Sequence, residues 1–289
     1  MNLSTLLFIL PFLLGAEPSS EELDALMRAK WRQFFHQVAR DYSLVRQPDQ
    51  RRLELVDKPV YTWARSGPQG GTYGGVYVWT NQGNVESVAC YWRNPNNAGN
   101  GLAVAHELHS LSPVVLSSEG KVSNSWKPKA GLKRQILNGS AKPEASAVQR
   151  MQQMRTLCRD FAAHSISSSD ERTELRLLPQ PLYRYQSTNP EIVDGALFAF
   201  VCSIGTDPEI FLQLEAINTD EGPRWHFTAA RFSHLDLHLN YQGKEVWQAL
   251  RDTENPISHN ADQTYWLFHK PVDQARIDAL SGQQTNKDE

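Results

Sequence analysis

The feature that most limits how this chain can fold is a similarity between its two halves. The segment RLELVDKPVYTW at residues 52–63 is matched by ELRLLPQPLYRY at residues 174–185. Leucine, proline and aromatic residues coincide in the two segments at a constant offset of 122. The coinciding pairs are Leu53 and Leu175, Leu55 and Leu177, Pro59 and Pro181, Tyr61 and Tyr183, and Trp63 and Tyr185.

The match continues in both directions along the chain. GGVYVW at 74–79 lies against GALFAF at 195–200, and Glu86 lies against Glu209. Side chains alternate between the two faces of a strand, so a chance match is not expected to keep the same apolar alternation through several strands. The pattern therefore predicts an internal duplication, with two copies of one structural unit.

Each predicted unit begins with an amphipathic helix. Ser19 and Glu22 have the spacing of a capping box at the start of the first helix. Apolar residues then recur at helical spacing, which predicts that each helix packs against its own unit. They are Met27, Trp31, Phe34, Val38 and Tyr42 in the first helix, and Met151, Met154, Cys158 and Phe161 in the second.

After each helix the pattern predicts strands with short connections, which favour antiparallel pairing. In the second unit we expect strands at 174–178, 181–185, 196–202, 209–217, 224–232 and 234–241, closed by a short helix near 243–251. The predicted fold class is α+β, with two similar units, each an N-terminal amphipathic helix followed by an antiparallel sheet. We assign residues 17–127 to the first unit, 128–143 to a linker, 144–275 to the second unit and 276–289 to a disordered tail.

Residues 1–16, MNLSTLLFILPFLLGA, have the form of a signal peptide. An apolar run from Leu6 to Gly15 contains Pro11 and is shorter than the roughly 20 residues that span a bilayer. We therefore expect export to the periplasm or the medium, with no integral membrane span after the signal is removed. The run has no Lys or Arg before it, so a cytoplasmic protein whose N-terminus packs as a helix stays an alternative.

The chain has three cysteines, Cys90, Cys158 and Cys202, which allow at most one disulfide. Each lies in a strand-like or helical apolar pattern, which favours buried packing thiols over a bridge. The formal net charge of −3 at pH 7 argues against a nucleic-acid partner.

One local pattern contains potential metal ligands. In HLDLHL, the side chains of His234, Asp236 and His238 share one face of a strand, with about 7 Å between alternate positions. A zinc site needs about four ligands that converge on one point, so a solvated strand face is the favoured interpretation. The string His106-Glu107-Leu108-His109 lacks the four-residue histidine spacing of a zinc-protease helix and indicates a strand.

A glycine-rich segment at residues 67–75 leads into a strand rather than a helix, so we interpret it as a hairpin connection and not a phosphate loop. Aromatic residues crowd the strands that follow the first helix. Tyr77 and Trp79 are matched by Phe198 and Phe200, which favours core packing over ligand stacking.

The strings LRLLPQPLYRY, DGALFAFV and GTDPE, followed by GKEVW, resemble a group of bacterial exported proteins with no known activity. The resemblance covers about residues 150–250. It implies export and a repeated module, and it assigns no functional residue.

These observations predict a non-catalytic extracytoplasmic protein that binds a protein, glycan or apolar ligand, or has a structural role. No catalytic or cofactor-binding residue is assigned and no cofactor is expected. The alternative is an extracytoplasmic hydrolase or metal-dependent enzyme with a site in the second unit or between the units. For that alternative His234, Asp236 and His238 are the candidate ligands.

Overall fold

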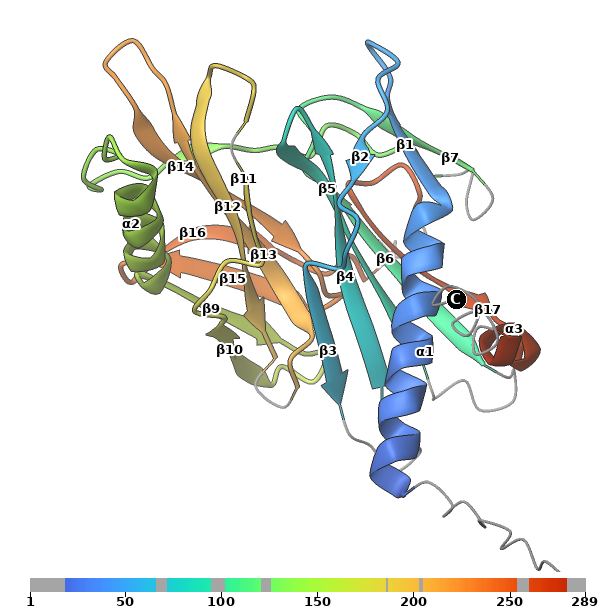
Figure 1. Ribbon diagram of the computed structural model, residues 1–289. Coiled ribbons are helices and arrows are strands. Elements are labelled where there is room, and N and C mark those ends of the chain that lie inside the picture. The colour runs from blue at the N-terminus through green and yellow to red at the C-terminus, as the bar shows by residue number, and fades with distance from the viewer. Residues whose placement is uncertain are drawn as a thin grey trace, which may run out of the picture.

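The structure is a computed structural model that describes residues 19–65, 72–94, 102–120, 126–185, 187–202, 205–253 and 260–279. The predicted signal peptide at residues 1–16 lies outside this range. The described part contains the helices α1 (Ser20–Arg40), α2 (Ala147–Arg159) and α3 (Gln274–Ala279), and is otherwise mostly strands and their connections (Figure 1). None of these helices combines the length and the apolar character that crossing a bilayer requires.

Six strands form the first sheet, in which every neighbouring pair is antiparallel. The order is β17-β6-β5-β4-β2, with β3 also paired to β4. The strands are β2 (Glu54–Leu55), β3 (Tyr61–Arg65), β4 (Thr72–Asn81), β5 (Asn84–Asn94), β6 (Ala103–Ser110) and β17 (Tyr265–Pro271). A separate antiparallel pair consists of β1 (Tyr42–Arg46) and β7 (Leu116–Gly120).

Nine strands form the second sheet, again antiparallel throughout. The order is β16-β15-β9-β10-β12-β13-β14-β8, with β11 also paired to β12. The strands are β8 (Gln135–Ile136), β9 (Phe161–Ile166), β10 (Arg172–Leu177), β11 (Tyr183–Tyr185), β12 (Ile192–Val201), β13 (Pro208–Ile217), β14 (Arg224–Arg231), β15 (Asp236–Tyr241) and β16 (Lys244–Ala249).

The central strands are buried on both faces, which explains their nearly continuous apolar sequences. In β4, Tyr77 and Trp79 pack toward α1, whereas Val76 and Val78 pack toward the second sheet. The strand β12 of the second sheet likewise packs one face toward a helix and the other toward the first sheet. Its Phe198 and Phe200 belong to the cluster with α2, and Leu197 and Ala199 face the first sheet.

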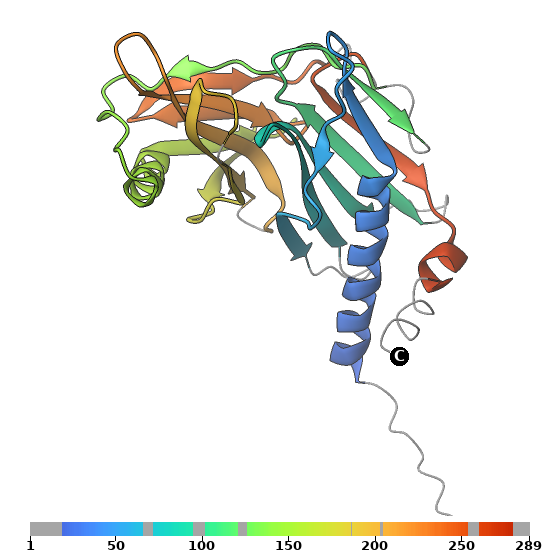
Figure 2. The same cartoon turned by 45° about the horizontal axis from the view of Figure 1, so that its top comes forward.

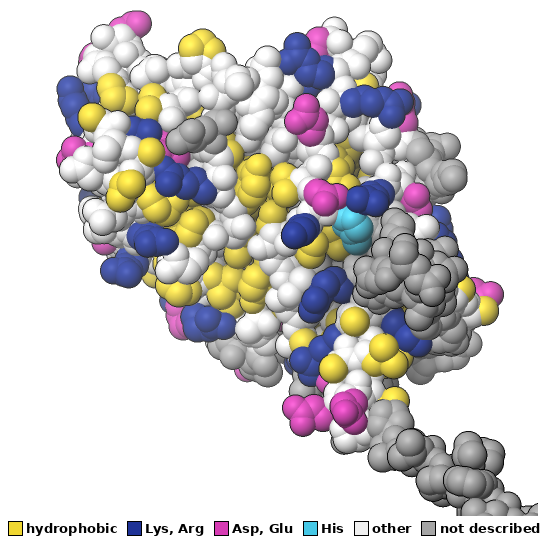
Figure 3. Space-filling model, in the orientation of Figure 1, with side chains coloured by type: hydrophobic (Ala, Val, Ile, Leu, Met, Phe, Trp, Pro, Cys, Tyr) yellow, Lys and Arg dark blue, Asp and Glu magenta, His cyan; other side chains and the backbone are white. Residues whose placement is uncertain are grey.

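The two sheets therefore face each other across a shared apolar layer, with α1 and α2 on opposite outer sides (Figures 1 and 2). Figure 2 also shows the first turns of α1 extending past the edge of the first sheet. In Figure 3 hydrophobic side chains gather along the seam between the sheets. Partly buried apolar residues that pack against the shared layer are Val56, Val60, Tyr61, Leu178, Leu182 and Tyr183.

The predicted α+β class with two helix-plus-sheet units is wrong, because the chain is mostly β and its parts are not self-contained. Residues from both sheets make up the central cluster, including Val76 and Leu197. The strand β17, expected in the second unit, pairs with β6 in the first sheet. The expected linker at 128–143 contains β8, which pairs with β14. The hydrophobic pattern showed which faces are apolar but not which sheets would bury them against each other.

Several local predictions can be compared with the structure. The capping box of Ser19 and Glu22 is confirmed at the start of α1. The helix expected near 243–251 is the strand β16, and Phe161 begins β9 because α2 ends at Arg159. The first residues of the expected disordered tail, 276–279, belong to α3, and residues 280–289 lie outside the described range.

Several strand pairings recur in the two halves of the chain, although β9–β10 and β15–β16 have no counterpart among the described strands of the first half. The strand β1 pairs with β7, and β9 pairs with β15. Both β2 and β3 pair with β4, as both β10 and β11 pair with β12. Within these pairs Trp63 lies opposite Gly74 and Tyr185 lies opposite Gly195, which are residues matched by the sequence comparison.

Candidate functional site: a pocket between the two sheets

The three residues considered as metal ligands do not converge on one point. His238 Nδ1 lies 2.7 Å from Glu245 Oε1, and its ring stacks on His164 with 4.6 Å between centroids. Asp236 accepts the Arg251 backbone N–H at 2.5 Å and pairs with the Arg251 guanidinium. His234 is exposed and lines a different pocket. In the part of the chain that is described, no group of three or more His, Cys, Asp or Glu side chains is placed to hold a metal ion.

The string from His106 to His109 forms part of the strand β6, as expected. Burial lowers the pKa of both histidines to about 3, so both rings are neutral at physiological pH. The His106 Nδ1 lies 2.9 Å from the Tyr42 hydroxyl, in the core beside α1. Strand alternation turns Glu107 to the face opposite His106, toward the second sheet.

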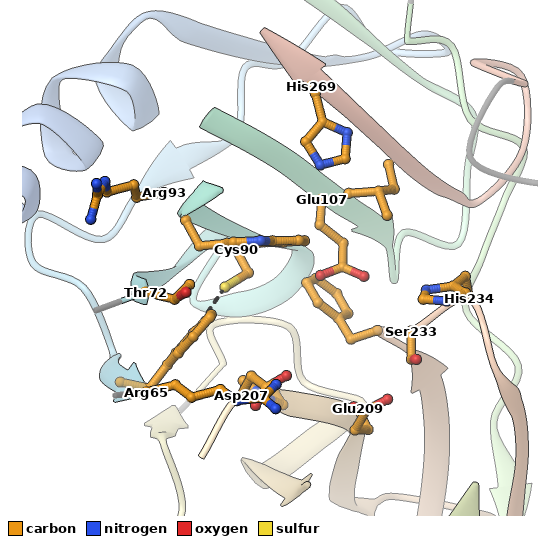
Figure 4. Close-up of a pocket in the computed structure, with 15 residues that line it drawn as sticks. Arg65, Thr72, Cys90, Arg93, Glu107, Asp207, Glu209, Ser233, His234 and His269 are labelled. Carbon is orange, nitrogen blue, oxygen red and sulfur yellow. Dashed lines mark hydrogen bonds between the residues drawn. The ribbon is translucent and has the colours of Figure 1, made fainter. Parts of the chain in front are cut away.

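Glu107 reaches a pocket of about 380 Å³ between the sheets, drawn in Figure 4. The first sheet contributes residues of β3, β4, β5, β6 and β17, and the second sheet contributes the start of β13 and the segment after β14. Three kinds of side chain matter for its chemistry. They are the aromatic residues Trp63, Trp92 and Phe232, the carboxyls Glu107, Asp207 and Glu209, and the basic groups Arg65, Arg93, His234 and His269.

Strand register accounts for the first-sheet wall of this pocket. Glu107 lies opposite Cys90 on β5 and opposite Leu267 on β17. Two residues along the strands, and so on the same face, Gly74 lies between Trp63 and Trp92. Residues in such rows project from the same face of a sheet, so the rows place the carboxyl beside the two indoles.

Gly74 makes room for the Trp63 ring. A Cβ at Gly74 would lie closer than 3.0 Å to the Trp63 indole. The indole Nε1 donates to Cys90 Sγ at 3.3 Å, and the Trp63 and Trp92 rings are 6.4 Å apart. The glycine-rich segment thus leads into a strand, as expected, although its residues 67–71 lie outside the described range.

The Glu107 carboxyl is buried and holds its proton at neutral pH. Burial raises its pKa to about 8, a hydrogen bond from the Tyr265 hydroxyl at 2.5 Å opposes this shift, and the charges of Glu209 and Asp207 add to it. Arg231 lies nearby, but its guanidinium donates to the carbonyl oxygens of Ser233, Leu235 and Leu250. The pocket lining therefore includes a carboxyl that is protonated at neutral pH.

Glu209 and Asp207 provide hydrogen-bond acceptors that no described residue uses. Burial raises the pKa of Glu209 to about 7, the Ser233 hydroxyl opposes that shift, and Asp207 adds to it. Glu209 Oε2 and Asp207 Oδ1 are buried atoms with no hydrogen-bond partner among the described residues. An unsatisfied buried polar group costs about 1–3 kcal/mol. These two atoms therefore favour a hydrogen-bond donor inside the pocket.

Glu86, the sequence match of Glu209, shows what a satisfied carboxyl looks like at the corresponding place. Leu111 N donates to Glu86 O at 2.8 Å, and Phe232 N donates to Glu209 O at 2.7 Å. The Glu86 side chain, however, pairs with Arg46 and accepts hydrogen bonds from Asn81 at 2.9 Å and Ser112 at 2.7 Å. One carboxyl is saturated by the protein, whereas Glu209 keeps an oxygen unpaired.

The remaining sequence predictions about side chains have mixed outcomes. All three cysteines are free, as expected for packing thiols, and Cys90 and Cys158 are buried. Tyr77 and Trp79 are core residues, as expected. Trp63 belongs to the buried cluster between the sheets and also lines the pocket, together with Trp92.

Glu107, Asp207 and Glu209 were not predicted as a group from the sequence. The available signal was a charged residue in the apolar strand LAVAHELHSL and another beginning the apolar strand EIFLQLEA. Which strands face each other is not visible in either string. No protein-family model, curated protein or solved structure matches this chain.

Proposed function

We propose that this protein is a non-catalytic extracytoplasmic binding protein that holds a small ligand in the pocket between its two sheets. The observation that supports this best is the pair of buried oxygens, Glu209 Oε2 and Asp207 Oδ1, which have no partner among the described residues. A volume of about 380 Å³, aromatic walls and a few polar groups are typical of small-molecule sites.

A matched pair of leucine variants tests this proposal. Leu267 lines the pocket, so Leu267→Trp should fill part of it, whereas Leu250 is 54% exposed and lies outside it. Ligand-observed NMR against a mixed fragment library should give hits with the wild type and Leu250→Trp, and should lose them with Leu267→Trp. Equal hits in all three proteins, or none with the wild type, would remove the pocket as a binding site.

The second candidate is a hydrolase, and the raised pKa values of Glu107 and Glu209 favour it. A carboxyl that is protonated near pH 7 is suited to act as a general acid, and a neighbouring carboxylate can act as the base. Turnover of chromogenic esters or glycosides that is lost in both Glu107→Gln and Glu209→Gln would favour the enzyme. Saturable binding without turnover would favour the binding protein.

Two further proposals concern origin and location. The strand pairings that recur in both halves, together with the sequence match of the halves, support an internal duplication after which only one copy left its carboxyl unpaired. The apolar N-terminal run and the resemblance to exported bacterial proteins support export.

A further inference from the structure

The inter-sheet pocket combines aromatic faces with acceptors that lack donors, and this combination indicates a ligand class. Trp63, Trp92 and Phe232 offer apolar faces on which a cation is attracted by the ring quadrupole. Glu209, only 8% exposed, has a free acceptor oxygen in the same space, and Asp207 has another. In Figure 4 these carboxyls and Glu107 lie around one cavity.

We propose that the pocket binds a primary or secondary ammonium attached to an aromatic or apolar body. Its N–H groups would donate to Glu209 and Asp207, and its body would lie against Trp63 and Trp92. The inference rests on the proposed function, because it assigns a ligand class to the same pocket.

The hydrogen-bonding pattern explains why an ammonium with N–H groups fits better than other ligands. A carboxylate ligand brings no donor for the unpaired oxygens of Glu209 and Asp207. An alcohol brings one donor and no charge. A quaternary ammonium brings charge but no donor, so it would leave Glu209 Oε2 unsatisfied.

Three arginines lie in or near the pocket, and they point in different directions. Arg231 is directed to backbone carbonyls. Arg65 and Arg93 line the pocket, but in Figure 4 Arg93 is directed away from the carboxyls, and Arg65 approaches the Asp207 side rather than Glu107.

Ligand binding should be coupled to proton release. The pKa values of Glu107 and Glu209 are raised mainly by burial, and an ammonium beside them would favour their ionised forms. Several polar and titratable groups face Glu107 and Glu209. They are Tyr265 and His269 on β17, Arg231 at the end of β14, Ser233 and His234 after it, Asp207 before β13, Cys90 on β5 and Arg65 on β3.

Isothermal titration calorimetry with four probes tests the inference. The probes are 2-phenylethylamine, its quaternary analogue, 2-phenylethanol and 3-phenylpropionate. We expect the primary amine to bind at least about tenfold more tightly than the other three, since a hydrogen bond to a charged group contributes about 1.5–3 kcal/mol. Its affinity should rise from pH 6 to pH 8, and proton release should appear as a dependence on the ionisation enthalpy of the buffer.

Variants locate the site. Glu209→Gln should weaken binding of 2-phenylethylamine about tenfold or more and reduce proton release. The control Glu174→Gln changes an exposed carboxyl on β10 and should have no effect. The ammonium inference is overturned if the alcohol or the acid binds as tightly, if no amine binds at millimolar concentration, or if Glu209→Gln binds like the wild type. Tight binding of the alcohol or acid that is lost in Leu267→Trp would overturn the ligand class but keep the proposed function.

Discussion

The indole of Trp63 occupies the space where a side chain at Gly74 would begin. The two residues are register partners on β3 and β4, and a Cβ at Gly74 would lie closer than 3.0 Å to the ring. Tyr185 and Gly195 repeat this relationship on β11 and β12. In each sheet the missing side chain of the glycine lets an aromatic ring pass over its strand to the strand beyond. There Trp63 donates to Cys90, and the Tyr185 hydroxyl donates to Glu215 at 2.7 Å.

Gly74→Ala should therefore destabilise the protein by about 1–3 kcal/mol, as overpacking of a filled core does. The free energy of unfolding can be measured by urea denaturation. If the clash with the indole is the cause, Gly74→Ala should cost much less in a Trp63→Ala background, and the double-mutant cycle reports this coupling. Equal costs in both backgrounds would show that backbone conformation, and not the ring, requires glycine.

A buried ion cluster links α2 to the second sheet, and we expect it to contribute strongly to the free energy of unfolding. Asp194 is fully buried on β12 and accepts from Arg150 of α2 at 2.9 Å and from Arg184 at 2.7 Å. Asp194→Ala leaves two arginines without their anion, for which we expect a loss of about 3–5 kcal/mol in unfolding free energy.

The matched control for this cluster is an exposed ion pair. Arg172 and Glu174 lie 2.7 Å apart, with side chains 57% and 65% exposed. Glu174→Ala should change the free energy of unfolding by about 0.5 kcal/mol or less. Similar losses for Asp194→Ala and Glu174→Ala would contradict the expectation that burial determines the cost.

The N-terminal prediction can be tested independently of the fold. The apolar run from Leu6 to Gly15 is too short to anchor a retained span, so export should be followed by cleavage after Ala16. Expression of the full chain in a bacterium, followed by fractionation and intact-mass analysis, should give a periplasmic or secreted protein that begins at Glu17. Uncleaved protein in the cytosolic fraction would support the cytoplasmic alternative.

The sequence predicted local structure better than it predicted architecture. Helical spacing and a capping box defined α1, and apolar alternation predicted that Tyr77 and Phe198 point into cores. The failure came with long-range contacts. Nothing in the string that forms β17 shows that it pairs with β6, more than 150 residues earlier, because both partners are ordinary apolar strands.

The same limit applies to the pocket. Glu107 and Glu209 were visible as charges in or beside apolar strands, but their proximity depends on two sheets meeting face to face. The HLDLHL pattern, in contrast, could be seen in the sequence because it depends on neighbouring residues alone. Its alternation is a local property of β15, and the structure gives His238 a local partner, Glu245, on the adjacent strand β16.

The pH dependence of stability should report on Glu107. Its ordinary pKa of 4.5 applies in the unfolded chain, whereas burial raises the pKa to about 8 in the fold. Between these values the folded state binds more protons than the unfolded state, so this group makes stability fall as pH rises from 4.5 to about 8. Below 4.5 both states are protonated and the penalty is absent.

Glu107→Gln removes this titration and keeps an oxygen that can accept from the Tyr265 hydroxyl. Relative to the wild type, the variant should gain unfolding free energy with rising pH, with a slope of up to about 1.4 kcal/mol per pH unit in that window. His106 and His109, whose pKa values fall to about 3, act in the opposite direction between pH 3 and 6.5, but they are present in both proteins and cancel in the difference. Urea denaturation at pH 5, 7 and 9 measures the difference. A value that stays constant across these pH values would show that Glu107 is ionised in the folded protein throughout, and that its environment supplies a cation that compensates for burial.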